Sequence, residues 1–230
     1  MPPTPPQPLL AARGLVVGYG LPVCPPVDLA VRPGEVLAVV GANGTGKSTL
    51  LRTLLGHLEP LGGHAELLGV EVDPRSVEVR AAVAQDLGDD AFFPALTVRE
   101  HLLLTCYGHR VTGASDVVDG LLEEFGLLER SAALPAALSS GQRRRLLLAA
   151  ALARPRSLLV LDEPEQRLDV GMRKHLVERL AEEREAGGAV LLATHDPAVV
   201  TGAATGVLHI GEAEVRTLGR DAGAAAVAAL

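Results

Sequence analysis

A short glycine-rich loop at residues 41–48 strongly limits which folds this chain can adopt. Its sequence GANGTGKS fits the pattern G-x-x-x-x-G-K-[ST], between an aliphatic run at 36–40 and good helix formers at 47–55. In a strand-loop-helix unit of this kind, successive backbone N–H groups and the positive end of the helix point toward one anion. We therefore predict a phosphate-binding loop within an α/β fold.

The residue types in the loop indicate a nucleoside triphosphate, ATP, held with Mg²⁺. Glycine lets the backbone turn its N–H groups inward, the lysine ammonium neutralises β- and γ-phosphate oxygens, and the serine hydroxyl is a ligand for Mg²⁺. A glycine-rich turn with an exposed lysine is the alternative, and the flanking strand and helix disfavour it. The predicted nucleotide-binding residues here are Gly41, Asn43, Gly44, Thr45, Gly46, Lys47, Ser48 and Thr49.

Two further aliphatic runs, at 158–161 and 189–193, also end abruptly in polar residues. Because ligands of open α/β sheets bind at the carboxyl ends of strands, we expect these residues to join the glycine-rich loop. Asp162 is predicted to hold Mg²⁺, and Glu163 to accept a proton from the water that attacks the γ-phosphorus. His195 either orients phosphate and water or is an ordinary residue at a strand end.

The remaining pattern predicts an α/β fold with a P-loop NTPase core of mainly parallel sheet flanked by helices. Short pieces with Gly, Pro and Val predict an antiparallel β portion at 9–31, and a helical subdomain is expected as an insertion at about 86–155. We expect a flexible Pro-rich tail at 1–8, a single domain at 9–230 and either a short helix or a frayed tail at 221–230. Further helices are predicted at 98–106, 115–125, 141–153 and 170–186.

Composition excludes several classes of function. The 21 basic and 28 acidic side chains give a formal charge of −7, which argues against direct nucleic-acid binding. Cys24 and Cys106 lack metal-ligand spacing and are expected to be buried free thiols. No apolar run approaches the roughly 20 residues of a membrane span. The segment MPPTPPQP does not resemble a signal peptide.

The segment Leu138-Ser139-Ser140-Gly141-Gln142 resembles the signature of ABC-type ATPases, usually LSGGQ. The resemblance covers nearly the whole chain in the family's motif order. Tyr19 matches the aromatic residue that stacks on adenine, and Gln85 matches the Q-loop. Leu168-Asp169 matches the D-loop, and His195 matches the switch histidine.

The resemblance implies a head-to-tail, ATP-dependent dimer of two such domains, here expected to be a homodimer. The signature of one copy, with Ser139, Ser140, Gly141 and Gln142, would complete the ATP site of the other, to which Asp169 would contribute. Gln85 would contact Mg²⁺ or the attacking water and couple the site to the helical subdomain, which meets a membrane partner. Glu163 would be the catalytic base.

Some residues depart from the family pattern. Ser140 replaces a glycine of the signature, while its backbone can still meet a phosphate. Glu165 and Arg167 replace small or hydroxyl residues and are expected to put an extra charge pair at the dimer seam. The run 143–145, three arginines early on a helix, is either a solvated face paired with acids or a contact with another chain.

The favoured function is the ATPase subunit of a membrane transporter whose transmembrane permease subunit is a separate chain. Such a subunit is cytoplasmic and peripheral on the cytoplasmic face of the cell membrane through its partner. The segment LTVRE at 96–100 resembles exporter-type ATPases and favours export. The alternatives are a soluble ABC ATPase acting on ribosomes or chromosomes, and a non-hydrolysing half of a heterodimeric pair.

Overall fold

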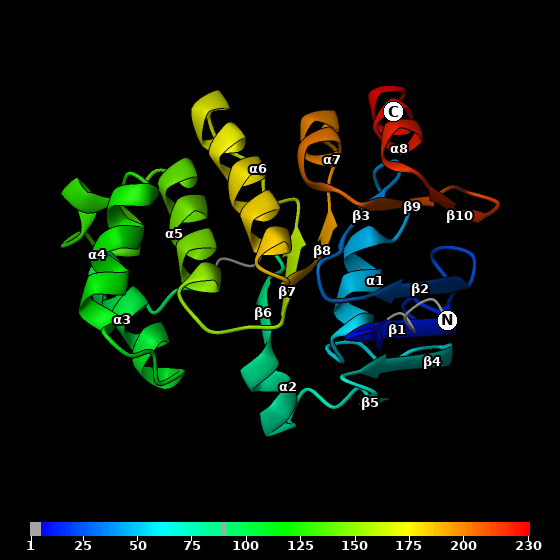
Figure 1. The fold of residues 1–230 in the computed structure, drawn as a ribbon, viewed down its shortest axis with the longest axis horizontal. Coiled ribbons are helices and arrows are strands. Elements are labelled where there is room, and N and C mark those ends of the chain that lie inside the picture. The colour runs from blue at the N-terminus through cyan, green and yellow to red at the C-terminus, as the bar shows by residue number, and fades with distance from the viewer. Residues whose placement is uncertain (1–5, 89–90) are drawn as a thin grey trace.

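A computed structural model describes residues 6–88 and 91–230 of the chain. Two β-sheets and the helices around them build the molecule, with the helical part at one end and the smaller sheet at the other (Figure 1). Residues 1–5 of the predicted tail lie outside the described residues, and so do 89–90 within the segment predicted as a helical subdomain.

The larger sheet has the strand order β10-β9-β3-β8-β7-β6 in the described part of the chain. From β9 to β6 neighbouring strands are parallel, and β10 is an antiparallel edge strand. The three aliphatic runs predicted as strands are β3, β7 and β8, confirmed to within one residue. The bounds are β3 Val36–Val40, β6 Val83–Asp86, β7 Leu158–Asp162, β8 Ala189–Ala193, β9 Gly206–Ile210 and β10 Val215–Leu218.

The smaller sheet is antiparallel, with the order β2-β1-β4-β5 among the described residues. It confirms the antiparallel portion expected at 9–31 and extends it to Glu71. Its strands are β1 Leu10–Val16, β2 Val27–Val31, β4 Gly62–Leu67 and β5 Val70–Glu71.

Helix α1, Lys47–Leu54, lies between the two sheets and follows the glycine-rich loop directly (Figure 1). Its buried leucines Leu50, Leu51 and Leu54 share one hydrophobic core with strands of both sheets. This burial anchors the first turn of α1, and with it the loop, against the carboxyl end of the larger sheet.

The opposite face of the larger sheet is covered by helices that form a second core. The residues expected to be either a helix or a frayed tail are helical from Arg220 onward and pack against α7 and β9. These helices are α5 Ser140–Leu152, α6 Val170–Glu185, α7 Pro197–Ala203 and α8 Arg220–Ala228.

A helical insertion separates β6 from β7, as the fold class predicted (Figure 1). It consists of α3 Val98–Gly108 and α4 Ala114–Glu124 packed with α5, while the short α2, Val77–Ala82, precedes β6. Thr97 and Glu100 form a capping box at the start of α3. The segment 96–100 therefore encodes a helix start.

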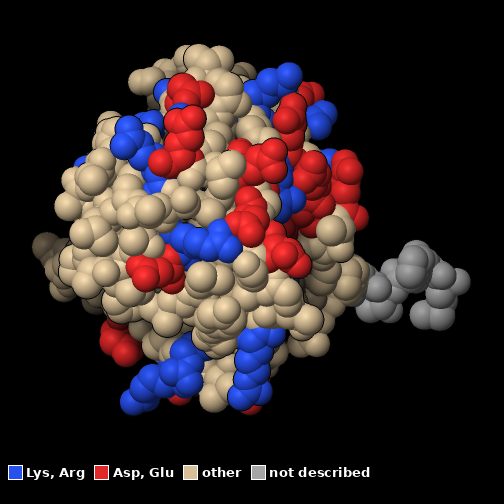
Figure 2. Space-filling view, turned by 90° about the vertical axis from the view of Figure 1, so that its left-hand side faces the viewer, with Lys and Arg blue, Asp and Glu red and all other residues tan. Residues whose placement is uncertain are grey.

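The surface carries charged side chains of both signs. On the face drawn in Figure 2, acidic and basic side chains are interspersed rather than gathered into a basic stripe. Cys24 and Cys106 are buried free thiols, as predicted. Within residues 6–88 and 91–230, no helix is both long and apolar enough to span a bilayer.

Candidate nucleotide-binding site

The carboxyl ends of β3, β8 and β7 lie side by side and bring the predicted site residues together. Ala193 is in register with both Val39 and Asp162, so the three strands end at nearly the same level. The glycine-rich loop follows β3, Glu163 follows β7 and His195 follows β8 soon after. Parallel pairing thereby converts three distant sequence segments into one edge.

The glycine-rich loop is closed around the ammonium group of Lys47. Gly46 is the N-cap of α1 with φ 91°, and a Cβ there would stand 2.7 Å from the Val23 side chain. Lys47 is 5% exposed, and its Nζ donates to the carbonyls of Gly41 at 2.9 Å and Ala42 at 3.0 Å. Burial lowers the pKa of Lys47, although nearby carboxylates oppose this effect.

Ser48 and Asp162 form the oxygen pair expected of a Mg²⁺ site. Their side chains are hydrogen-bonded to each other. Burial raises the pKa of Asp162, partly offset by that hydrogen bond. The second carboxylate oxygen, Oδ1, is buried and has no hydrogen-bond partner among the described residues. Because Mg²⁺ binds through one or two protein oxygens together with substrate phosphates, these residues fit the ion.

Glu163 lies beside His195 at the end of β7. His195 Nε2 is 3.3 Å from Glu163 Oε1, and the Gln166 amide donates to Glu163 Oε2. The Glu163 backbone has φ 46°, a sparsely populated conformation for a side chain other than glycine, and its N–H donates to Ala193 O at 2.9 Å. The Glu163 carboxylate is thus held between His195 and Gln166, close enough to the glycine-rich loop to act on the charge of Lys47.

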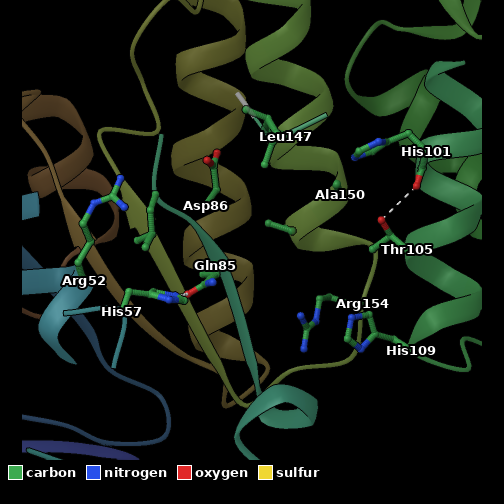
Figure 3. A pocket seen from close by; sticks show the side chains of 13 residues that line it. Arg52, His57, Gln85, Asp86, His101, Thr105, His109, Leu147, Ala150 and Arg154 are labelled. Atoms are coloured by element: carbon green, nitrogen blue, oxygen red, sulfur yellow. Dashed lines mark hydrogen bonds between the residues drawn. The ribbon is translucent and has the colours of Figure 1, made fainter. Parts of the chain in front are cut away.

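Gln85 does not join this cluster. Its Oε1 is hydrogen-bonded to His57 Nε2 at 2.9 Å, on the wall of a neighbouring groove of about 350 Å³ (Figure 3). The groove lies between α1 and β6 on one side and α3 and α5 on the other. It adjoins the site through β6 and separates the strand ends from the helical insertion.

The groove is lined with nitrogen-bearing side chains. His101 is 6% exposed, and its Nδ1 is buried without a hydrogen-bond partner among the described residues. Burial lowers the pKa of His101 and of Arg154, and burial together with Arg154 lowers the pKa of His109. Arg52 completes the opposite wall (Figure 3). The protonated forms of His101, His109 and Arg154 are therefore held at an energetic cost.

The signature-like segment occupies the start of α5. Ser139 is the N-cap, and its hydroxyl accepts from Gln142 N while the Gln142 side chain accepts from Ser139 N. A Cβ on Gly141 would stand 2.8 Å from the Arg167 carbonyl oxygen, so position 141 requires glycine. Ser140 is exposed, which is why a side chain fits there.

The other two predicted contacts lie apart from the strand ends. Asp169 is the N-cap of α6, where its Oδ1 accepts from Met172 N at 2.9 Å and its Oδ2 pairs with Arg145. Tyr19 is 69% exposed. Asn43 and Thr49 are on the loop and the first turn of α1.

Comparison with known proteins assigns the family. The model of the ABC transporter family matches residues 24–166, more than half of the chain. The chain belongs to the ABC transporter family. The matched segment runs from ahead of the glycine-rich loop to the turn after Glu163, so it includes that loop, Asp162 and Glu163, whereas His195 lies beyond it.

Curated relatives support this assignment. The cytochrome c biogenesis ATP-binding export protein CcmA of Bordetella parapertussis is 35% identical over 93% of this chain and 95% of that protein. CcmA of Paramagnetospirillum magneticum is 41% identical over 79% of this chain and 82% of that protein. The zinc import ATP-binding protein ZnuC of Paracoccus denitrificans is 40% identical over 84% of this chain and 72% of that protein.

Solved structures agree with the fold. One, described as the ATP-binding subunit of an ABC transporter, is 28% identical with a TM-score of 0.84 and covers 93% of this chain and 91% of its own. A dimeric ATP-binding cassette in a post-hydrolysis state with ADP and Pi has a TM-score of 0.82. It is 21% identical and covers 92% of this chain and 98% of its own.

The structure changes two expectations drawn from the sequence, one about Glu165 and one about the arginine run 143–145. Glu165 is buried and hydrogen-bonded within its own chain, so it does not form an exposed charge pair with Arg167. Of the arginine run, Arg144 is 6% exposed and bound to Asp86, and Arg145 pairs with Asp169. Arg144 and Arg145 are therefore paired with acids, whereas Arg143 donates to Leu138 O at 3.0 Å. Arg144 is internal rather than solvated.

Gln166 also escaped sequence analysis, although its partner Glu163 did not. A polar side chain three residues after a predicted base is the only available signal. It is weak, because such residues usually face solvent.

Proposed function

We propose that this chain binds ATP with Mg²⁺ and hydrolyses it to drive a membrane transporter whose transmembrane subunit is a separate chain. The observation that carries the proposal is the convergence of Lys47, the Ser48–Asp162 pair and Glu163 with His195 at one sheet edge. Their chemistry covers phosphate charge, metal ligation and proton transfer, which are the requirements of phosphoryl transfer.

Each side chain has one task in the proposed reaction. The loop N–H groups and Lys47 bind the phosphates, and Ser48 and Asp162 hold the metal. Glu163 accepts the proton of the attacking water, while His195 donates to phosphate or water from the other side. A Mg²⁺ ion held by Ser48 and Asp162 would neutralise part of the phosphate charge. Gln85 would leave His57 to contact the metal or the water.

A second copy of the chain is proposed to complete the site. The helix start at 139–142 has backbone N–H groups and a positive dipole end suited to the γ-phosphate of a partner copy. Ser140 keeps its backbone N–H, so this role survives the replacement of glycine. The dimeric cassette with ADP and Pi among similar structures supports such pairing. Hydrolysis would reopen the dimer, because ATP favours the closed state.

The membrane partner is proposed to dock in the groove of Figure 3 with an acidic segment. The groove presents Arg154, His101 and His109, whose pKa values burial lowers. A carboxylate of the partner would offset the cost of their protonated forms. Docking there would place the partner against Gln85, next to the hydrolysis site. The chain would then be peripheral on the cytoplasmic face of the membrane.

Export is favoured over import. The CcmA relatives and the Nod factor export protein of Burkholderia pseudomallei, 39% identical over 72% of this chain and 55% of that protein, are named exporters. ZnuC of Paracoccus denitrificans is named an importer. A transport assay in vesicles of known orientation, reconstituted with the partner, decides the direction.

Steady-state phosphate release tests the ATPase proposal. Wild-type chain should release phosphate with ATP and Mg²⁺, and Glu163→Gln should lose at least about 100-fold in rate, because it removes the proton acceptor. The exposed Glu178→Gln is the matched control. Glu163→Gln should also trap ATP and elute as a dimer in size-exclusion chromatography with nucleotide. Equal rates for wild type and Glu163→Gln would refute the base assignment.

Detergent extraction tests the transporter role. The tagged chain should recover a protein with transmembrane helices, and Arg154→Glu should abolish that recovery while ATP hydrolysis by the isolated chain persists. A compensating Asp→Arg or Glu→Arg change in the recovered protein should restore it. Recovery with ribosomes in place of a membrane protein would support the soluble alternative.

A further inference from the structure

Glu165 is a buried carboxylate beside the proposed catalytic pair. It lies two residues after Glu163 and is 6% exposed, so it is not part of an exposed surface as the sequence led us to expect. Its Oε1 accepts a hydrogen bond from Thr194 Oγ1 at 2.6 Å and another from the backbone N–H of His195 at 3.0 Å. Glu165 Oε1 therefore accepts two hydrogen bonds from the turn that carries His195.

Further hydrogen bonds of Thr194 hold the same turn. Thr194 is fully buried, and its hydroxyl also accepts from Asp196 N at 3.0 Å. Thr194 N in turn donates to Val39 O at 3.1 Å, which ties the turn to the end of β3. The backbone of His195 is thus held from the side by Glu165, and not by the sheet alone.

Glu165 itself belongs to a constrained turn. Glu163 and Arg167 have φ values of 46° and 62°, and Leu168 N donates to Glu165 O at 3.3 Å. The turn that carries the base and the turn that carries the histidine are therefore joined by one side chain. This joint sets where the His195 ring stands relative to Glu163 Oε1, 3.3 Å away.

Resting on the proposed ATPase function, we propose that Glu165 is a positioning residue that holds His195 in its working place against Glu163. Its role depends on distance. The side chain carries the acceptor Oε1 four bonds away from Cα, which brings it to Thr194 Oγ1 and the His195 N–H.

Charge and reach can be separated by two conservative substitutions. Glu165→Gln keeps an oxygen at the same distance and removes the negative charge, whereas Glu165→Asp keeps the charge and withdraws the oxygen by one methylene group. If position matters, Asp is the harmful change.

The experiment measures kcat and KM for ATP together with nucleotide affinity by calorimetry. Glu165→Asp should lower kcat about 10- to 100-fold, because displacement of a catalytic group by about 1 Å costs that order, with affinity changed by less than about threefold. Glu165→Gln should keep kcat within about twofold of wild type. In combination with His195→Ala, Glu165→Asp should add no further loss, since both act through one ring.

A second readout is independent of turnover. In a ¹H–¹⁵N spectrum, the His195 amide proton should shift upfield in Glu165→Asp, where it loses its acceptor, and stay in place in Glu165→Gln. Phosphate release by wild type together with an unaltered kcat and amide shift in Glu165→Asp would overturn the positioning role. Equal losses in both variants would do so as well. Absence of phosphate release by wild type would instead overturn the proposed function, and the amide shift would still decide the role of Glu165.

Discussion

Replacing Arg144 with methionine removes the guanidinium that joins the signature helix to two strand ends. Its Nη1 is 2.8 Å from Asp86 Oδ2 at the end of β6, its Nη2 donates to Asp162 O at 2.8 Å, and its Nε donates to Pro164 O at 3.3 Å. Methionine retains most of the apolar stem, so the substitution tests the polar contacts rather than the packing.

The expected loss is about 3 kcal/mol of unfolding free energy, the lower end of the range for breaking a buried ion pair by removing one partner. The lower end applies because Asp86 keeps the hydrogen bond from the Gly88 N–H at 3.1 Å. The neighbouring Arg145→Met breaks a partly exposed pair with Asp169, so it should cost no more than about 1 kcal/mol.

Urea unfolding of the nucleotide-free protein, followed by circular dichroism at constant pH, measures both variants. In thermal melts a chain of this size should lose roughly 6–12 °C for Arg144→Met and at most about 4 °C for Arg145→Met. The double variant with Asp86→Asn should lose less than the sum of the single losses. If Arg144→Met were no less stable than Arg145→Met, the reasoning from burial would be refuted.

Three other substitutions test the site. Lys47→Ala should weaken ATP binding in calorimetry about 10- to 100-fold, because a charge-assisted contact is lost, and the exposed Lys174→Ala should not; an affinity within a few-fold would contradict the assignment. Asp162→Asn should abolish hydrolysis yet stabilise the nucleotide-free fold at neutral pH, on the order of 1–3 kcal/mol, since it removes a buried charge. Burial raises the pKa of Asp162, so this gain should shrink as the pH falls into the acid range, and a gain independent of pH would be inconsistent with that cause. Gly46→Ala should weaken ATP binding more than Gly44→Ala: both have positive φ, but only at Gly46 does a Cβ meet another side chain, at 2.7 Å. Equal affinities would argue against that contact.

Local patterns in the sequence were sufficient for much of the fold and the site. The runs that became β3, β7 and β8 are aliphatic on both faces, which is typical of parallel strands covered by helices. The glycine-rich loop has a fixed spacing because successive N–H groups must meet one anion. Such features depend on residues close in sequence, and are therefore visible without a structure.

Strands β6 and β9 were not predicted. The run Val83–Asp86 is short and ends in polar residues, and it pairs only because Leu158–Asp162 lies beside it. Its end carries Gln85, whose partner in the structure is His57 rather than the metal-binding pair. A motif match locates such a residue in the chain, and the tertiary arrangement selects which of its neighbours it contacts.

The sequence by itself determined which chemical groups are present and the strand ends at which they stand. Only the tertiary structure decided that Glu165 faces inward to Thr194 and His195, and that Arg144 is buried against Asp86 rather than solvated. These partners lie 29, 30 and 58 residues away along the chain. A charged side chain is buried only where the fold brings its partners next to it. Because these partners are far away in the sequence, no local sequence pattern predicts the contacts.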